Sequence, residues 1–138
     1  MSVSIYTDAS VRRGSGAIAF TVTHPDRRKH LTISEPACGD IADLEILAVI
    51  RALSYGRRYH HHGLELFTDA RQVVDRHRYL RAHHFPASTE ERWVVFDHLA
   101  SYYRDDLTIH HEPRESTPLS RVVHAAAYHR AGGPLELA

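Results

Sequence analysis

The sequence predicts an α/β fold: a five-stranded mixed sheet, with three antiparallel strands followed by parallel strands, flanked by helices. Three apolar stretches near the start, 3–9, 16–24 and 30–35, have the length of strands and are joined by short turns. A helical apolar pattern over 41–56 then leads into another strand, 64–68. Because a helical crossover returns a strand parallel to its partner, 64–68 is expected to pair with 3–9, which makes 3–9 a central strand.

Turn residues bound the first three strands. Arg13 to Gly16 forms a tight glycine-bearing turn after the first strand, and Pro25 interrupts the chain after the second. The third strand alternates apolar and polar residues and ends at the breaker cluster PACGD, 36–40. These three strands are therefore expected to form an antiparallel meander.

The remaining elements alternate helices with strands. Asp40 is a plausible N-cap of the helix over 41–56, and Gly56 is expected to end it. Further helices are expected over 70–82, from a capping box at Ser88 or Thr89 with Glu91 to about Arg104, and over 119–130, with a fifth strand at 107–111. No repeat or low-complexity linker interrupts this order, so the prediction is a single domain over 1–138.

Composition and cysteine usage narrow the class of protein. The chain has 138 residues, 43% of them hydrophobic and 25% charged, which is ordinary for a soluble globular domain. No apolar run reaches the length of a membrane span and no signal peptide opens the chain, so we expect no membrane partner and a cytoplasmic location. Cys38 is the single cysteine; it excludes an intramolecular disulfide and is expected to be buried or half-buried. The sequence leaves the oligomeric state open, and a monomer is our expectation.

Three acidic residues are the main candidates for chemistry. Asp8 ends the first strand and Asp69 ends the fourth, so parallel pairing would place both carboxylates at the same sheet edge. Glu45 lies one turn into the first helix, whose crossover directs it toward that edge. Three converging carboxylates repel one another unless cations lie among them, and Mg²⁺ or Mn²⁺ prefers such oxygen ligands. The alternative for Asp8 alone is that it caps the following turn.

The segments IYTDAS, ADLEILAVIRAL and LELFTDARQVV together resemble the ribonuclease H family, type 1, in their order and expected topology. The resemblance implies an RNase H-like fold and cleavage of the RNA strand of RNA–DNA hybrids with two magnesium ions. It also implies products that carry a 3′-hydroxyl and a 5′-phosphate. Matched motif by motif, Asp8, Glu45 and Asp69 would be metal ligands.

The fourth acidic ligand of that family has no counterpart, because no Asp or Glu occurs between Glu115 and Glu136. A short-loop alignment of PRES puts Arg121 there, but arginine cannot ligate a cation. A longer-loop alignment puts His124 there, and a neutral imidazole can bind a metal, Mn²⁺ better than Mg²⁺. We favour His124 as the fourth ligand; the alternatives are Arg121 as a charge substitute and His124 as an ordinary helix residue beside a three-acid site.

Nucleic-acid contacts are expected from basic residues, although the formal net charge is zero. Arg12, Arg13 and Arg71 are candidates for phosphate contacts, with a solvated charged surface as the alternative for each. The family's hybrid-contacting asparagines are replaced by Ile41 and Ala42. Near the fifth strand, a group among His110, His111, Glu112 and Arg114 could assist proton transfer, and the histidines of YHHHG, 59–63, are more plausibly exposed than metal-binding.

Taken together, the sequence predicts a metal-dependent endoribonuclease acting on RNA–DNA hybrids with two Mg²⁺ or Mn²⁺ ions. The alternative is a catalytically altered module of the same fold that binds nucleic acid or cuts a different nucleic-acid substrate. The missing fourth acid favours the alternative, and the three retained acids oppose it.

Overall fold

A computed structural model describes residues 3–24, 30–59, 63–83, 90–113 and 115–132. Within these ranges no helix is long and apolar enough to cross a membrane. The expected capping box at Ser88 or Thr89 and most of the histidine segment 59–63 lie outside the described residues.

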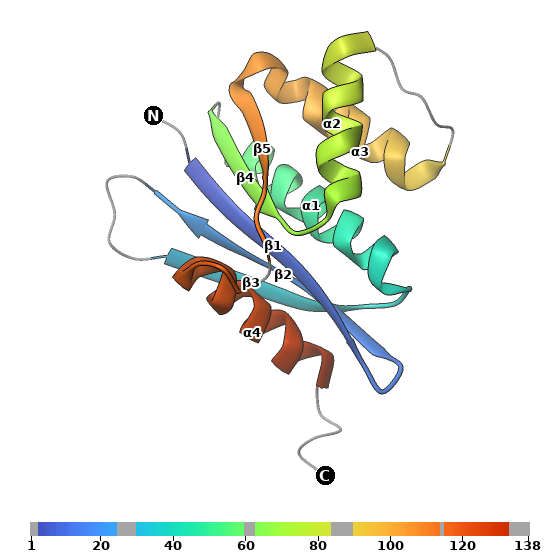
Figure 1. Cartoon of the computed structure of the whole chain (residues 1–138), viewed down its shortest axis with the longest axis vertical. Helices are drawn as coiled ribbons and strands as arrows, with labels where there is room; N and C mark the ends of the chain where they lie inside the picture. The colour runs from blue at the N-terminus through green and yellow to red at the C-terminus, as the bar shows by residue number, and fades with distance from the viewer. Residues whose placement is uncertain (1–2, 25–29, 60–62, 84–89, 114, 133–138) are drawn as a thin grey trace.

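One five-stranded sheet organises the molecule, in the order β3-β2-β1-β4-β5 (Figure 1). β2 pairs antiparallel with both β1 and β3, and β4 pairs parallel with both β1 and β5. The predicted mixed sheet and the central position of the first strand are therefore confirmed. The strands are β1 (Val3–Arg12), β2 (Ser15–Thr23), β3 (His30–Ala37), β4 (Leu64–Thr68) and β5 (Leu107–His111).

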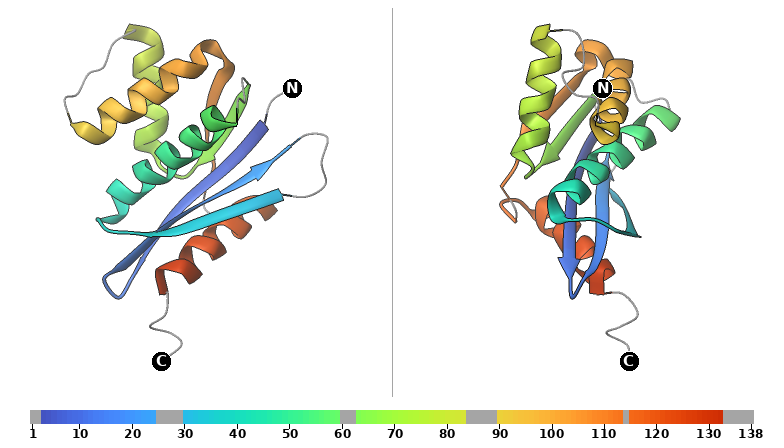
Figure 2. Two further views of the ribbon diagram at one scale, coloured as in Figure 1. Left: turned by 180° about the vertical axis from the view of Figure 1, so that it is seen from behind. Right: turned by 90° about the vertical axis from the view of Figure 1, so that its right-hand side faces the viewer.

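Helices cover both faces of the sheet. α1 (Ile41–Arg58) packs on β1 and β2, and α3 (Glu91–Tyr103) packs on α1. α2 (Arg71–His83) lies against β5, β4 and α3, and a short 3₁₀ turn (Arg104–Asp106) joins α3 to β5. α4 (Pro118–Gly132) packs on β1, β2 and β3 from the other side, and the left view of Figure 2 shows α1 and α3 in front of the sheet with α4 behind it.

The alternation of β1 side chains explains the two faces. Ile5 is fully buried in the main core with residues of α1 and α3, whereas Tyr6 packs with Val123 and Ala127 of α4. Because successive strand residues point to opposite faces, Asp8 lies on the same face as Tyr6, toward α4.

β1 is longer than predicted, and this corrects the position of Asp8. The strand continues past Asp8 to Arg12 and pairs there with β2, so that Asp8 lies opposite Ala19 inside a strand. Arg13 and Gly14 form the turn, both with positive φ (52° and 78°). A two-residue turn of this kind matches the twist of paired strands, which lets the hairpin extend beyond the run of apolar residues.

Gly56 does not end α1 as predicted. The helix continues to Arg58, and Gly56 is buried inside it, where a Cβ would overlap the hydroxyl of Tyr103. The glycine allows close approach of α3 and is not a helix stop. Cys38 was also expected to be buried or half-buried and is exposed.

Candidate active site

The candidate active site lies at a fork between β1 and β4. These strands pair only as far as Tyr6 and Phe67. Beyond that point β1 continues into the hairpin with β2, whereas the chain leaves β4 for α2 (Figure 1). Asp8 and Asp69 line one small recess at the fork, and Ser120 and Val123 of α4 border it. The predicted meeting of Asp8 and Asp69 at one sheet edge agrees with this geometry.

Asp8 is almost completely buried, with 4% of its surface exposed. The backbone N–H of Ala9 donates to its Oδ1 at 2.8 Å, and Nδ1 of His124 lies 2.7 Å from its Oδ2. A buried carboxylate is costly unless polar groups compensate it, and both oxygens here have such a contact.

The start of α4 fixes the position of His124. The N–H of Ser120 donates to the Thr117 hydroxyl at 3.3 Å, and the N–H of Thr117 donates to Oγ of Ser120 at 2.8 Å. This reciprocal pair caps the helix in the manner of a capping box. His124, two turns farther on, has its second ring nitrogen 3.2 Å from Oε1 of Glu115, so the imidazole bridges two carboxylates.

Glu45 lies outside the lining of the recess. It is half-buried in the second turn of α1. The side-chain amide of Gln72, on α2, donates to the carbonyl of Ala42 at 3.1 Å, which brings the first turns of α1 and α2 together. Ala42 lies one turn before Glu45 along α1, so the start of α2 approaches this end of the helix.

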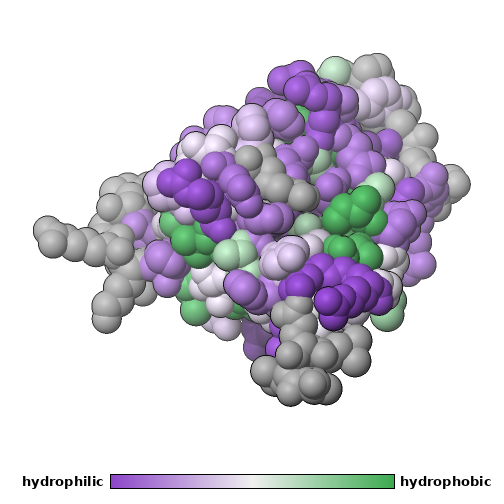
Figure 3. Space-filling view, turned by 60° about the horizontal axis from the view of Figure 1, so that its bottom comes forward, coloured by the Kyte–Doolittle hydropathy of each residue, from purple (hydrophilic) through white to green (hydrophobic). Residues whose placement is uncertain are grey.

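The predicted phosphate contacts differ in their surroundings. Arg12 stacks on the ring of Tyr128, with its guanidinium carbon 3.9 Å from the ring centre, and donates to the Tyr128 carbonyl at 3.2 Å. Arg13, at the hairpin turn, and Arg71, at the start of α2, are exposed. Arg121 is also exposed and donates to the carbonyl of Glu115 at 3.5 Å. Figure 3 shows that the end of the molecule carrying the hairpin and α4 is mostly hydrophilic.

The four residues near β5 that were candidates for proton transfer lie in different surroundings. His110 stacks on Phe67 and lies 3.3 Å from Oε1 of Glu65, and His111 is exposed. Glu112 lines the recess together with Asp8 and Asp69, whereas Arg114 lies outside the described residues. From the sequence, Glu112 is expected only as a candidate for proton transfer and not as a metal ligand.

Burial raises the pKa of Tyr6, and the charges of Glu112 and Glu65 raise it further. Tyr6 also lines the recess, and because its pKa is raised, its phenol is protonated at neutral pH. The recess is thus rich in negative charge and has an aromatic wall.

The donor chemistry of the recess fits a hard divalent cation. Carboxylate oxygens of Asp8, Asp69 and Glu112 are the ligands that Mg²⁺ and Mn²⁺ prefer. In the described part of the chain, no three acidic, histidine or cysteine side chains are already close enough to form a metal site. Side-chain rotation would therefore have to bring the carboxylates together around a cation.

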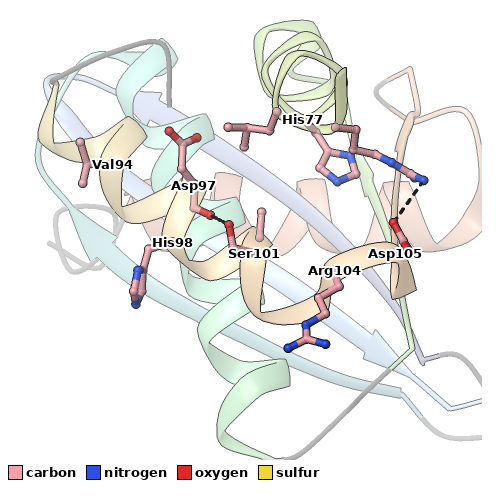
Figure 4. Close-up of a pocket in the computed structure, with 10 residues that line it drawn as sticks. His77, Val94, Asp97, His98, Ser101, Arg104 and Asp105 are labelled. Atoms are coloured by element: carbon pink, nitrogen blue, oxygen red, sulfur yellow. Dashed lines mark hydrogen bonds and ion pairs between the residues drawn. The ribbon is translucent and has the colours of Figure 1, made fainter. Parts of the chain in front are cut away.

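A larger cavity, of about 620 Å³, lies between α2 and α3. Figure 4 shows His77 on α2 and Asp97 and Ser101 on α3 around it, with Asp105 near α2 and with His98 and Arg104 pointing away from His77. None of the predicted site residues lines this cavity, so it is separate from the fork.

Residues 1–104 match the model of the RNase H family. This chain belongs to the RNase H family. The match covers β1 through α3 and hence includes Asp8, Glu45 and Asp69. β5 and α4, which hold Glu112 and His124, follow the matched region, and α4 is where the sequence departs from the family's fourth acid.

Solved RNase H structures share the fold. RNase H1 from the halophilic archaeon Halobacterium salinarum is 18% identical with a TM-score of 0.70, and each chain covers 100% of the other. The N-terminal RNase H domain of Rv2228c from Mycobacterium tuberculosis is 15% identical with a TM-score of 0.78, covering 99% of this chain and 97% of that chain. LC11-RNase H1, isolated from compost and solved in complex with an RNA/DNA hybrid, is 19% identical with a TM-score of 0.69 over 91% of this chain and 96% of that chain. No curated protein matches the sequence.

Proposed function

We propose that this RNase H family chain is a metal-dependent endoribonuclease that hydrolyses the RNA strand of RNA–DNA hybrids. The family match supports a nuclease, and the observation that carries the proposal is the meeting of Asp8 and Asp69 at the β1–β4 fork. The structure of LC11-RNase H1 with an RNA/DNA hybrid supports the choice of substrate. The products would carry a 5′-phosphate on one side of the cut and a 3′-hydroxyl on the other.

Asp8, Glu45 and Asp69 would hold two Mg²⁺ or Mn²⁺ ions. With such ions bound, the site gains a Lewis acid that makes water a better nucleophile and neutralises charge on the leaving oxygen. The protein orients Asp8 through the Ala9 N–H and the His124 ring, so one carboxylate is fixed before substrate arrives. Glu45 would approach the phosphate from α1, which packs on the face of the sheet opposite α4.

His124 is proposed to complete the second ion site or to position Asp8. Its Nδ1 contacts Asp8 and its Nε2 contacts Glu115. For His124 to bind a cation directly, one of these nitrogens would have to leave its carboxylate partner. The positioning role requires no rearrangement and follows from the 2.7 Å contact.

The substrate would be held through phosphate contacts from Arg13, exposed at the β1–β2 turn, and from Arg71, exposed at the start of α2. Arg12 would contribute less, because its guanidinium is engaged with Tyr128. Guanidinium groups at these positions give sequence-independent affinity for a nucleic-acid backbone.

The test is cleavage of an end-labelled RNA–DNA hybrid in Mg²⁺ or Mn²⁺. Wild type should cut the RNA strand and leave 5′-phosphate ends, and Asp69→Asn should abolish cutting while retaining hybrid binding. Asp75→Asn is the matched control, because Asp75 is an exposed acid on α2 away from the recess. Failure of wild type to cut the hybrid under any metal condition would refute the proposal.

The alternative is a module of the same fold that binds nucleic acid or cuts a different substrate. Two observations favour this alternative. α4 has no acidic residue between Pro118 and Gly132. The His124 ring also contacts the Asp8 carboxylate at the oxygen that a cation would otherwise bind. Cleavage of single-stranded or double-stranded RNA in preference to hybrid would support the altered substrate. Equal binding without cutting by wild type and Asp69→Asn would support the binding module.

A further inference from the structure

Three neighbouring strands repeat one pattern at the edge that carries the site. Tyr6 of β1 is in register with Phe67 of β4, which is in register with His110 of β5. Their rings stack in a row, with centroid separations of 4.5 Å for Tyr6 and Phe67 and 4.7 Å for Phe67 and His110. This aromatic row faces the same side of the sheet as α4 but lies partly beyond it, since α4 packs on β1, β2 and β3.

An acidic residue follows each ring two positions later: Asp8, Asp69 and Glu112. Asp8 lies inside β1, two residues after Tyr6, and therefore points to the same face as that ring, whereas Asp69 and Glu112 directly follow the ends of β4 and β5. All three carboxylates line the recess. The N–H of Glu112 donates to the carbonyl of Thr68 at 2.8 Å, which continues the parallel ladder one residue past the end of β5. Glu112 is thereby placed beside Asp69, and both line the recess with Asp8.

We propose that Glu112 supplies the fourth carboxylate of the metal site, from the end of β5 instead of from α4. This inference rests on the proposed function, because it assigns Glu112 to the same ions as Asp8 and Asp69. It accounts for the absence of an acidic residue in α4, where Arg121 turns to the carbonyl of Glu115. The carboxylate that α4 lacks is present instead at the end of β5.

The surroundings of Glu112 suit a ligand that moves a short distance. Its Oε1 accepts a hydrogen bond from Oγ of Ser116 at 2.8 Å, which holds the half-buried carboxylate at the rim. Without a cation, repulsion keeps three carboxylates apart; a bound cation reverses this and draws Glu112 toward Asp8 and Asp69.

Mn²⁺ binding in the absence of nucleic acid tests the proposal independently of catalysis. Free Mn²⁺ is followed by electron paramagnetic resonance during titration of wild type, Glu112→Gln, Asp69→Asn and Glu65→Gln. Glu112→Gln is expected to weaken Mn²⁺ binding by about 10-fold or more. Glu65→Gln is the matched control, since Glu65 lies on the same face of β4, two residues before Phe67 and away from the lining of the recess. It should change the affinity by less than about two-fold.

The outcomes separate this inference from the function on which it rests. If wild type binds Mn²⁺, Asp69→Asn loses binding and Glu112→Gln binds as wild type does, Glu112 is not a ligand, although the nuclease proposal stands. If wild type neither binds Mn²⁺ nor cuts hybrid, both proposals fail. Thermal melting of each variant in EDTA checks that Glu112→Gln is folded, since removal of one of three repelling charges should not lower its melting temperature.

Discussion

At the scale of single residues, the site depends on how one buried carboxylate is compensated. The sequence suggested a cation as the partner of Asp8, and the structure adds two protein groups, the Ala9 N–H and the His124 ring. These contacts hold the carboxylate in one conformation. His124 is therefore the residue at which the metal-ligand role and the positioning role can be tested directly.

Replacement of His124 should affect the hybrid-cleavage rate and the metal requirement together. His124→Ala removes the contact to Asp8 and is expected to lower the rate by about 10- to 100-fold. His124→Asp places a second carboxylate against Asp8, so its melting temperature should fall in EDTA and recover in Mn²⁺ more than that of wild type. Unchanged cleavage and unchanged Mn²⁺ dependence in His124→Ala would show that His124 is an ordinary helix residue.

His77 provides a second prediction at this scale, in the cavity between α2 and α3. Burial, together with the nearby charge of Arg81, lowers the pKa of His77 from 6.5 to about 4. As the pH falls, His77 is therefore protonated in the unfolded chain before it is protonated in the folded protein. The contribution of neutral His77 to the free energy of unfolding is complete above pH 6.5 and is lost progressively toward pH 4. The loss is at most roughly 3 kcal/mol in the free energy of unfolding.

Urea unfolding at pH 7.5 and pH 4.5 measures this effect. His77→Leu should reduce the difference in unfolding free energy between the two pH values, because the titrating group is gone. His98→Leu is the control, since His98 lies at the same cavity but is exposed. An equal pH difference in wild type and His77→Leu would contradict the assignment.

At the scale of elements, α1 and α3 meet closely because of Gly56. The hydroxyl of Tyr103 donates to the carbonyl of Leu53 at 2.7 Å, directly beside this glycine. Gly56→Ala would gain up to about 1 kcal/mol of helix propensity, but the new methyl group overlaps Tyr103, and overpacking of this kind costs about 1–3 kcal/mol. A net loss of about 1 kcal/mol in the free energy of unfolding is expected by thermal or urea denaturation.

A double-mutant cycle isolates the cause. Tyr103→Phe alone should cost about 1 kcal/mol for the lost hydrogen bond. The combination with Gly56→Ala should cost less than the sum of the two single changes, because the overlapping atom is absent. Strictly additive losses would mean that Gly56 acts through helix propensity alone.

Helices and strands could be predicted from the sequence where the local pattern of apolar and turn residues determines them. The ends of elements and the roles of single residues were predicted less well, because packing between distant parts of the chain determines them. The strand order, the crossover through α1 and the meeting of Asp8 with Asp69 follow from periodicity and connection rules. The extension of β1 to Arg12 depends on pairing with β2, and the use of Gly56 depends on a tyrosine 47 positions later in the chain. The pattern of YTD, FTD and HHE is visible in the sequence, but its meaning requires the register of three strands.

At the scale of the whole molecule, binding of a polyanion must overcome a formal net charge of zero and an acidic recess. Affinity for a hybrid would then come from a few local arginines and not from a general positive field. Arg13 is exposed at the β1–β2 turn and Arg71 at the start of α2, whereas Arg51 of α1 forms an ion pair with Glu35 at 2.7 Å. The salt dependence of hybrid affinity can therefore show how many arginines contact phosphates.

Hybrid binding should weaken with salt in proportion to the number of phosphate contacts. In an Asp69→Asn background, which would leave the hybrid uncut, Arg13→Ala and Arg71→Ala should each reduce the slope of log affinity against log salt concentration by about 1. Arg51→Ala should leave that slope unchanged, because its charge is paired with Glu35 on another part of the surface. Fluorescence anisotropy over a series of KCl concentrations measures the slopes. Equal slopes for Arg13→Ala, Arg71→Ala and the parent would exclude the phosphate contacts proposed at the fork and would direct the search for the binding surface to other basic residues.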